Sequence, residues 1–423
     1  MFQNFRRDDA GKASHLSSGQ GGVSGSTRDT RLDVLRAICL MMIFINHVPG
    51  NPLEILTSKN FGFSDAAEAF VLISGIAAGF AYGRKFGAGE KLLTTLRAWR
   101  RACVLYVAQI MTTVASIAIF TLFAIGWSDP RLFDTINMGR VMEDPARAIL
   151  GIVTLGHQLG YNNILSMYAG ILRMLPGFLL ISRWRLWAMV LVSIAIWFFA
   201  GLTAFGPRTY PGEGFWFFNP LSWQLIFILG IACNMHIARG GTILRNKWLI
   251  IAAAAYLVVS CVWVWWPLWG YERVLGLPRI LTGFDKTFLS LPRVLHVLAI
   301  AYLIAALPWL SSLFRLGYDN PLAIIGRHGL PIFILGTLMA ITAQGFIKVT
   351  FAGPVTSTLI VVAGLLLHVA YAYYLEWLGR VKRQAASGRK SASNPAIADQ
   401  AAAPKDIAAK APTAETAPRG IIS

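Results

Sequence analysis

The chain has 423 residues, of which 56% are hydrophobic and 14% are charged, and its mean hydropathy is +0.57. Soluble domains carry about 25% charged residues, so this composition excludes an ordinary globular surface and favours many membrane spans of about 20 residues. The net charge of +18 would suit a nucleic-acid-binding protein, but Lys and Arg concentrate in the tails and in alternate loops, which excludes that class. The lipid bilayer is therefore the first partner that the composition predicts.

The chain divides into three predicted segments. Residues 1–30 are rich in Ser, Gly and charge and lack the apolar stretch of a signal peptide, so we interpret them as a disordered cytoplasmic tail. Residues 381–423 are rich in Ala, Lys and Pro and are interpreted in the same way. Residues 31–380 form the predicted transmembrane domain.

The fold class predicted for this domain is all-α, a polytopic transmembrane helix bundle of about ten spans. The apolar runs long enough to cross a bilayer are 33–49, 65–83, 103–126, 163–181, 186–204, 220–237, 248–268, 292–308, 329–348 and 355–377. The loops after even-numbered runs are basic, which places both termini in the cytoplasm. Clear examples of these basic loops are 84–101, 183–185, 239–247 and 380–383.

The opposite loops carry mixed charge and are predicted to face the periplasm. The loops 127–162 and 205–219 are long, and the second contains the aromatic, Pro- and Gly-rich stretch 210–216. These residues either form a mouth for an external ligand or belong to the Trp and Tyr belt at the membrane interface.

Arg36 and His47 are the most informative polar residues of the first run. A charged residue at membrane depth is costly and so usually marks function. The two are eleven residues apart, roughly three helical turns, which puts them on one helix face about 16 Å apart along the axis. A phosphate-bearing donor held at Arg36 would then reach His47 with its reactive end. Otherwise Arg36 snorkels to the interface and His47 is a packing histidine.

Two carboxylates open the second run. Ser64 or Asp65 is suitably placed to cap the helix, and the charge of Asp65 would meet the positive end of the helix dipole. Glu68 lies deeper, and a carboxylate that bonds to His47 would orient the imidazole ring. Gly75 and Gly79 follow as a GxxxG pattern, which predicts close helix packing.

Further pocket candidates lie in later runs. Arg293 and His296 share one face of the eighth run at roughly the depth of His47, and Trp223 and Gln224 lie early in the sixth. Arg293 is interpreted as a pocket residue, with an interfacial anchor as the alternative.

Other polar residues fit structural roles. Arg327 and His328 are predicted at the basic, cytoplasmic start of the ninth run, and His368 is predicted to pack within the tenth. The four cysteines lack the spacing of a metal site and are interpreted as packing residues. The motifs of soluble enzymes are missing (P-loop, GxGxxG, HExxH, GxSxG), and no metal site is predicted.

Arg36 and His47, with ten residues between them, resemble the R-x10-H motif of the membrane acyltransferase-3 superfamily. The surrounding sequence is similar to one branch, the OpgC family, over about residues 31–380. The segments that carry this resemblance are 32–36, 44–51, 60–71, 219–224, 293–299 and 326–333.

The resemblance implies a function, because OpgC proteins succinylate osmoregulated periplasmic glucans in Gram-negative bacteria. We therefore expect an O-acyltransferase of the bacterial inner membrane, moving an acyl group, succinyl, from cytoplasmic acyl-CoA to a sugar hydroxyl of a periplasmic glucan. Acyl-CoA is then a substrate, and no bound cofactor is expected. The alternative is a transporter or flippase of a small anionic or saccharide substrate, since buried Arg, His and carboxylate groups also serve proton relays. A membrane scaffold would leave those residues unexplained.

Roles for the polar residues follow from the implied reaction. His47 takes the proton of the attacking hydroxyl or carries the acyl group transiently, while Asp65 or Glu68 orients it. Arg36 binds the phosphates of the donor. The acyl- or acceptor-binding residues are Arg293, His296, Trp223 and Gln224, and the first two hold the succinyl carboxylate or stabilise the oxyanion.

Overall fold

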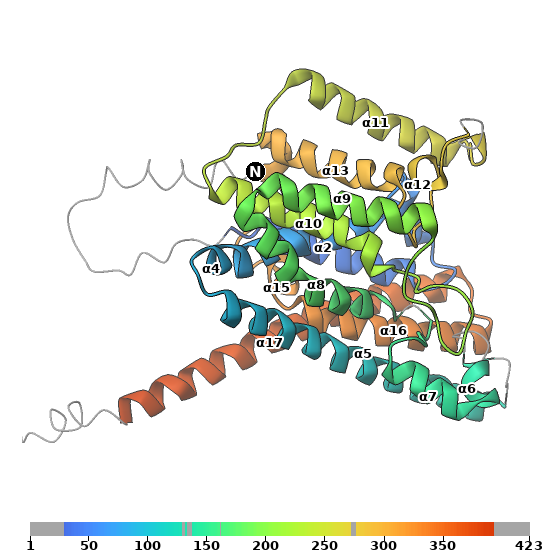
Figure 1. The fold of residues 1–423 in the computed structure, drawn as a ribbon. Coiled ribbons are helices and arrows are strands. Elements are labelled where there is room, and N and C mark those ends of the chain that lie inside the picture. Colours follow the sequence, from blue (N-terminus) through green and yellow to red (C-terminus); the bar gives the residue numbers. More distant parts are fainter. Residues whose placement is uncertain (1–28, 129–131, 133–137, 161, 272–275, 393–423) are drawn as a thin grey trace, which may run out of the picture. The chain divides into compact units, whose positions relative to one another are not determined.

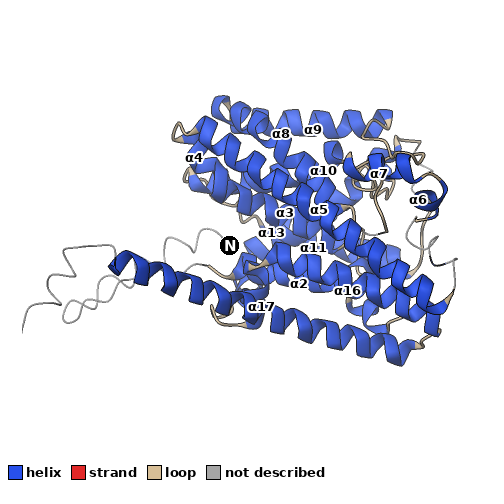
Figure 2. Cartoon of the chain, turned by 90° about the horizontal axis from the view of Figure 1, so that it is seen from below, coloured by secondary structure: helices blue, strands red, loops and turns tan. Residues whose placement is uncertain are grey.

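The computed structural model describes residues 29–128, 132, 138–160, 162–271 and 276–392. These residues are mainly helical and form no strand, although one isolated bridge pairs Arg208 with Phe215 (Figure 2). The predicted all-α class is therefore confirmed. The chain divides into a large unit that ends at Tyr373 and a second unit that begins at Tyr374.

Every predicted span contains a helix. The matching helices are α2 (Arg31–Asn46), α3 (Ala66–Ala78) continued by η3 (Gly79–Gly83) and α4 (Arg84–Gly87), α5 (Lys91–Trp127), α8 (Ile164–Trp184), α9 (Leu186–Thr203), α10 (Pro220–Ala238), α11 (Lys247–Trp265), α13 (Leu291–Ala306), α16 (Gly329–Thr350) and α17 (Pro354–Ala392). Shorter helices connect them: η1 (Pro52–Leu56), η2 (Ser58–Asn60), α6 (Gly139–Glu143), α7 (Pro145–Val153), α12 (Arg279–Thr282), α14 (Pro308–Leu313) and α15 (Pro321–Arg327).

Length separates two of these helices from the rest. Among the described residues, 8 helices are long and apolar enough to cross a membrane, and neither α2 nor α13 is one of them. Each of the two has 16 residues. At 1.5 Å per residue they are about 24 Å long, shorter than a hydrocarbon core of about 30 Å.

Two helices extend beyond the predicted spans. α5 begins at Lys91, so Arg97, Arg100 and Arg101, which were predicted in a loop, lie on its first turns. α17 runs on to Ala392, into the segment predicted as a tail. The other tail residues, 1–28 and 393–423, lie outside the described residues.

α3 and α10 approach each other closely through glycines. A Cβ on Gly75 would lie 2.1 Å from the carbonyl oxygen of Phe227, and one on Gly230 would lie 2.4 Å from that of Leu72. Only a residue without a side chain fits at either point. The close packing predicted from the GxxxG pattern is confirmed, with α10 as the partner helix.

α2 is enclosed by other helices of the large unit. It packs against α3, α15 and α16. Its contact with α15 is again a glycine contact, since a Cβ on Gly326 would lie 1.8 Å from the carbonyl oxygen of Asp33. Around this group, α10 lies beside α9 and α11 lies beside α13 (Figure 1).

The four cysteines, all in the described part of the chain, form no disulfide: Cys39, Cys103, Cys233 and Cys261.

The glycine contact between α3 and α10 predicts that Gly75→Ala lowers the melting temperature of the detergent-purified protein. The added methyl group must push the two backbones apart, and overpacking costs about 1–3 kcal/mol. Gly177→Ala is the matched control, because Gly177 is an exposed glycine inside α8 with nothing within 4 Å of its added Cβ. That control should be neutral or stabilising. Equal melting temperatures for the two variants would contradict the assigned contact.

Candidate functional site

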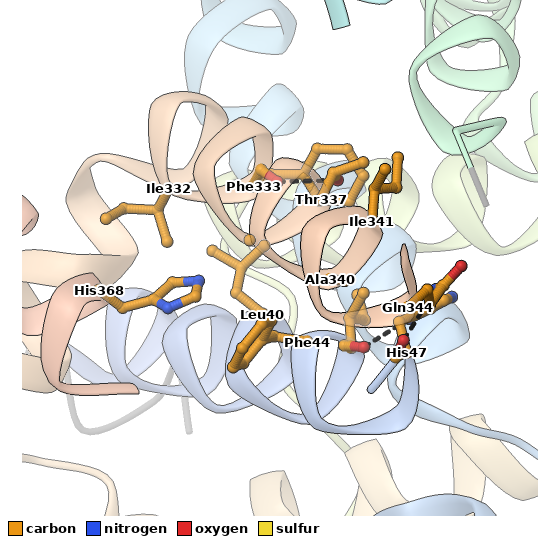
Figure 3. A pocket seen from close by; sticks show the side chains of 12 residues that line it. Leu40, Phe44, His47, Ile332, Phe333, Thr337, Ala340, Ile341, Gln344 and His368 are labelled. Atoms are coloured by element: carbon orange, nitrogen blue, oxygen red, sulfur yellow. Dashed lines mark hydrogen bonds between the residues drawn. The ribbon is translucent and has the colours of Figure 1, made fainter. Parts of the chain in front are cut away.

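A small cavity adjoins His47. We name it the imidazole cavity; it lies between α2, α16 and α17 and has a volume of about 30 Å³. Figure 3 shows Leu40, Phe44 and His47 of α2 on one side, facing residues of α16, with His368 of α17 at one end. An apolar cavity that holds benzene has about 150 Å³, so this cavity is too small for a group of that size.

The His47 ring is oriented by the helix that carries it. His47 directly follows the last residue of α2, and its Nδ1 lies 2.5 Å from the carbonyl oxygen of Ile43. A carbonyl only accepts hydrogen bonds, so Nδ1–H donates, and the neutral ring carries its lone pair on Nε2. The carbonyl oxygen of His47 accepts a 2.8 Å bond from Gln344 Nε2 of α16 (Figure 3). His368 also bonds within its own helix, to Gly364, and packs against Phe44 as predicted.

A larger cavity adjoins Arg36. We name it the arginine cavity; its volume is about 400 Å³, and it is lined by residues of α2, α3, α5, α8, α15 and α16. Arg36 Nη1 donates to Asp33 Oδ1 at 3.2 Å and to the Gly326 carbonyl oxygen at 3.0 Å. Arg101 and Arg327 line the same cavity. The Arg327 guanidinium also donates to the Tyr318 carbonyl oxygen at 3.0 Å and stacks on the Tyr318 ring. Three arginines therefore line one space, and their positive charge suits an anionic ligand.

Two of these arginines were not among the predicted site residues. Arg101 was expected in a basic loop, and Arg327, with its neighbour His328, at a basic helix boundary. The structure brings all three to the arginine cavity together with Arg36. For Arg327 and His328 the available signal was the segment 326–333, which contributes to the family resemblance.

The two carboxylates at the start of α3 are paired with cations. Asp65 accepts from the backbone N–H of Ala67 at 2.8 Å, and Glu68 accepts from that of Asp65 at 2.9 Å, which forms a capping box. The predicted cap at Asp65 is confirmed. Glu68 is fully buried and accepts from Arg293 at 2.5 and 2.7 Å, while Lys286 forms an ion pair with Asp65.

These pairs change the geometry expected around His47. Asp65 and Glu68 were predicted to orient its ring directly, and the structure places them in ion pairs with Lys286 and Arg293 instead. Two ion pairs therefore connect the start of α3 to Lys286 and Arg293.

The remaining predicted residues are buried and bonded within the chain. His296 Nδ1 lies 2.7 Å from Ser64 Oγ, and Trp223 Nε1 donates to the Lys286 carbonyl oxygen at 2.9 Å. Gln224 exchanges hydrogen bonds with Ser193 of α9. The described residues that line the three cavities of this section include none of these side chains.

The two long loops predicted to face the periplasm meet at a third cavity. We name it the loop cavity; it has a volume of about 600 Å³ and is lined by residues of 139–158 and 209–213. Arg140 Nη1 donates to the Pro211 carbonyl oxygen at 3.2 Å, and the Tyr210 N–H donates to that of Gly156 at 3.1 Å. Of the two interpretations of these loops, the cavity favours the mouth.

Comparison with known proteins adds one finding. Among curated proteins and among solved structures, none matches the chain. Residues 28–380 match the family described as OpgC protein. The matched segment contains α2 to α16 and the residues of all three cavities. The chain belongs to the OpgC family.

Proposed function

We propose that the chain is a membrane O-acyltransferase that moves an acyl group, succinyl, from cytoplasmic acyl-CoA to a sugar hydroxyl of a periplasmic glucan. The chain belongs to the OpgC family, Arg36 lies on α2, and His47 directly follows the last residue of that helix. The observation that carries the proposal is that each of the two residues lines a cavity on the side that contacts α16. In this proposal about ten spans cross the bacterial inner membrane and both termini are cytoplasmic, as the basic loops suggest. Arg36 then lies towards the donor and His47 towards the acceptor.

The donor is held by its phosphates in the arginine cavity. Guanidinium groups bind phosphate through two parallel hydrogen bonds, and the three arginines of this cavity offer several such forks. The bonds from Arg36 to Asp33 and to the Gly326 carbonyl oxygen preorganise one of them. Acyl-CoA remains a substrate, and no resident cofactor is part of the proposal.

His47 acts on the attacking hydroxyl. The hydroxyl oxygen attacks the thioester carbonyl carbon, its proton passes to Nε2 of His47, and a carbon–oxygen bond forms. The carbon–sulfur bond then breaks, and the proton moves from His47 to the departing sulfur, which leaves as the CoA thiol. If the acyl group first transfers to His47, Nε2 attacks the carbonyl carbon, a nitrogen–carbon bond forms and the carbon–sulfur bond breaks. The sugar hydroxyl then attacks the acyl carbon, the nitrogen–carbon bond breaks, and the hydroxyl proton passes to the thiolate to give the CoA thiol.

The ion-pair network positions this machinery. Asp65, Glu68, Lys286 and Arg293 connect the start of α3 to α13, and His296 packs behind them where a side chain on Gly62 would otherwise sit. We therefore assign positioning roles to Arg293 and His296. The same holds for Trp223 and Gln224, which hold α10 against its neighbours.

His47→Ala should reduce glucan acylation at least about a hundredfold, the typical contribution of a general base. The protein level in the membrane should stay unchanged. Mass spectrometry of periplasmic glucans, with and without the variant, measures the effect. His236→Ala, an exposed histidine at the end of α10, is the control and should acylate normally. Normal acylation by the His47 variant would refute the assigned base.

Arg36→Ala should weaken binding of CoA about tenfold or more, because a charge-assisted hydrogen bond contributes roughly 1.5–3 kcal/mol. Isothermal titration of CoA into the purified protein measures this. Arg173→Ala removes an exposed arginine from α8 and controls for the change in net charge. Equal affinities would contradict the donor site. A protein that moves its substrate without consuming any thioester would instead be a transporter.

Arg293→Gln should destabilise the protein strongly, because it leaves the buried Glu68 carboxylate without its cation. Removing one partner of a buried pair costs about 3–5 kcal/mol. The double variant Glu68→Gln, Arg293→Gln should regain part of that stability, since both charges are gone. Melting temperatures of the two single variants and the double variant form a double-mutant cycle. Additive losses would show that the pair is not coupled.

A further inference from the structure

Phe333 of α16 lies between the two cavities that face α2. Of the described residues that line the imidazole cavity and the arginine cavity, Phe333 alone belongs to both. Its side chain is 7% exposed, in contact with the main apolar core (Figure 3). On α2, Leu40 lies between Arg36 and His47 and is also buried, so an apolar layer separates the guanidinium groups from the imidazole.

The volumes show why this layer matters. The arginine cavity has about 400 Å³, whereas the imidazole cavity has about 30 Å³. A cavity that holds benzene has about 150 Å³, so a space of about 30 Å³ is too small for a succinyl group. A thioester bound by its phosphates beside Arg36 therefore reaches His47 only after a side chain between the cavities has moved.

Phe333 is the side chain best placed to move aside and connect the two cavities. A phenylalanine ring turns about two side-chain torsions without breaking a hydrogen bond, because it makes none. Since the ring forms part of both cavity walls, its displacement joins the two spaces without any shift of a helix. Arg36 and the other guanidinium groups keep their places during that movement.

We infer that the Phe333 ring is a gate between the bound donor and His47, and that it opens for the slender chain that joins the phosphates of acyl-CoA to its thioester. This inference rests on the proposed acyltransferase function. The phosphates stay in the arginine cavity while the acyl end passes the ring, and the space left by the displaced ring limits the size of the acyl group.

The test separates donor binding from transfer. Phe333→Trp puts a larger ring between the two cavities and obstructs the passage. CoA should therefore bind within about twofold of wild type while kcat for succinyl transfer falls about tenfold or more. Phe333→Ala opens the gate, so kcat/KM for a bulkier acyl-CoA, such as hexanoyl-CoA, should rise about tenfold relative to succinyl-CoA. Phe346 is the matched control: it lies on the same helix, is 37% exposed and lines neither cavity, and its Trp and Ala variants should change neither quantity.

Three results would overturn the gate. The first is a wild-type kcat for succinyl transfer in Phe333→Trp. The second is an unchanged preference between hexanoyl-CoA and succinyl-CoA in Phe333→Ala. A loss of CoA affinity in Phe333→Trp as large as its loss of kcat is the third, since Phe333 would then act in donor binding and not in the passage of the acyl end. If Phe333→Trp is not monodisperse on gel filtration, the acyl preference of Phe333→Ala alone decides whether the gate is accepted or rejected. Failure of the wild-type protein to bind CoA would instead refute the proposed function.

Discussion

Glu68 is fully buried at the start of α3, and an ionised carboxylate in such a place is stable only when it is paired and hydrogen-bonded. Its cation, Arg293, comes from α13, so α3 and α13 must meet in one register. Lys286 extends the constraint, because its ammonium pairs with Asp65 while its carbonyl oxygen accepts from Trp223 of α10. One network thus ties three helices together at the end of the bundle where α2 ends in His47.

Within this frame, α2 connects two different environments. One end carries Arg36 beside other guanidinium groups, in a cavity wide enough for a large anion. The other end adjoins His47 and a cavity of only about 30 Å³. A large anion therefore has room beside Arg36, whereas the walls beside His47 must move before a group of benzene size fits.

The sequence predicted the helices well because apolar length is a local property. All ten apolar runs contain a helix, and the first run holds Arg36 on α2 with His47 directly after its last residue. Partners between helices were not predictable in this way. Glu68 and Arg293 are 225 positions apart, and each was singled out for its cost at membrane depth without its partner being evident. Periodicity shows which face of a helix is polar but not which helix covers it, so Arg101 and Arg327 were assigned to basic boundaries.

The shortness of α2 has an electrical consequence. At about 24 Å, α2 is shorter than a hydrocarbon core of about 30 Å, so in a membrane this helix leaves part of the barrier to its neighbours. Leu40, Phe44 and Phe333 leave exposed fractions of only 3%, 2% and 7% and form an apolar layer beside α2. In a membrane-spanning chain, an apolar layer of this kind opposes the passage of ions along the helix.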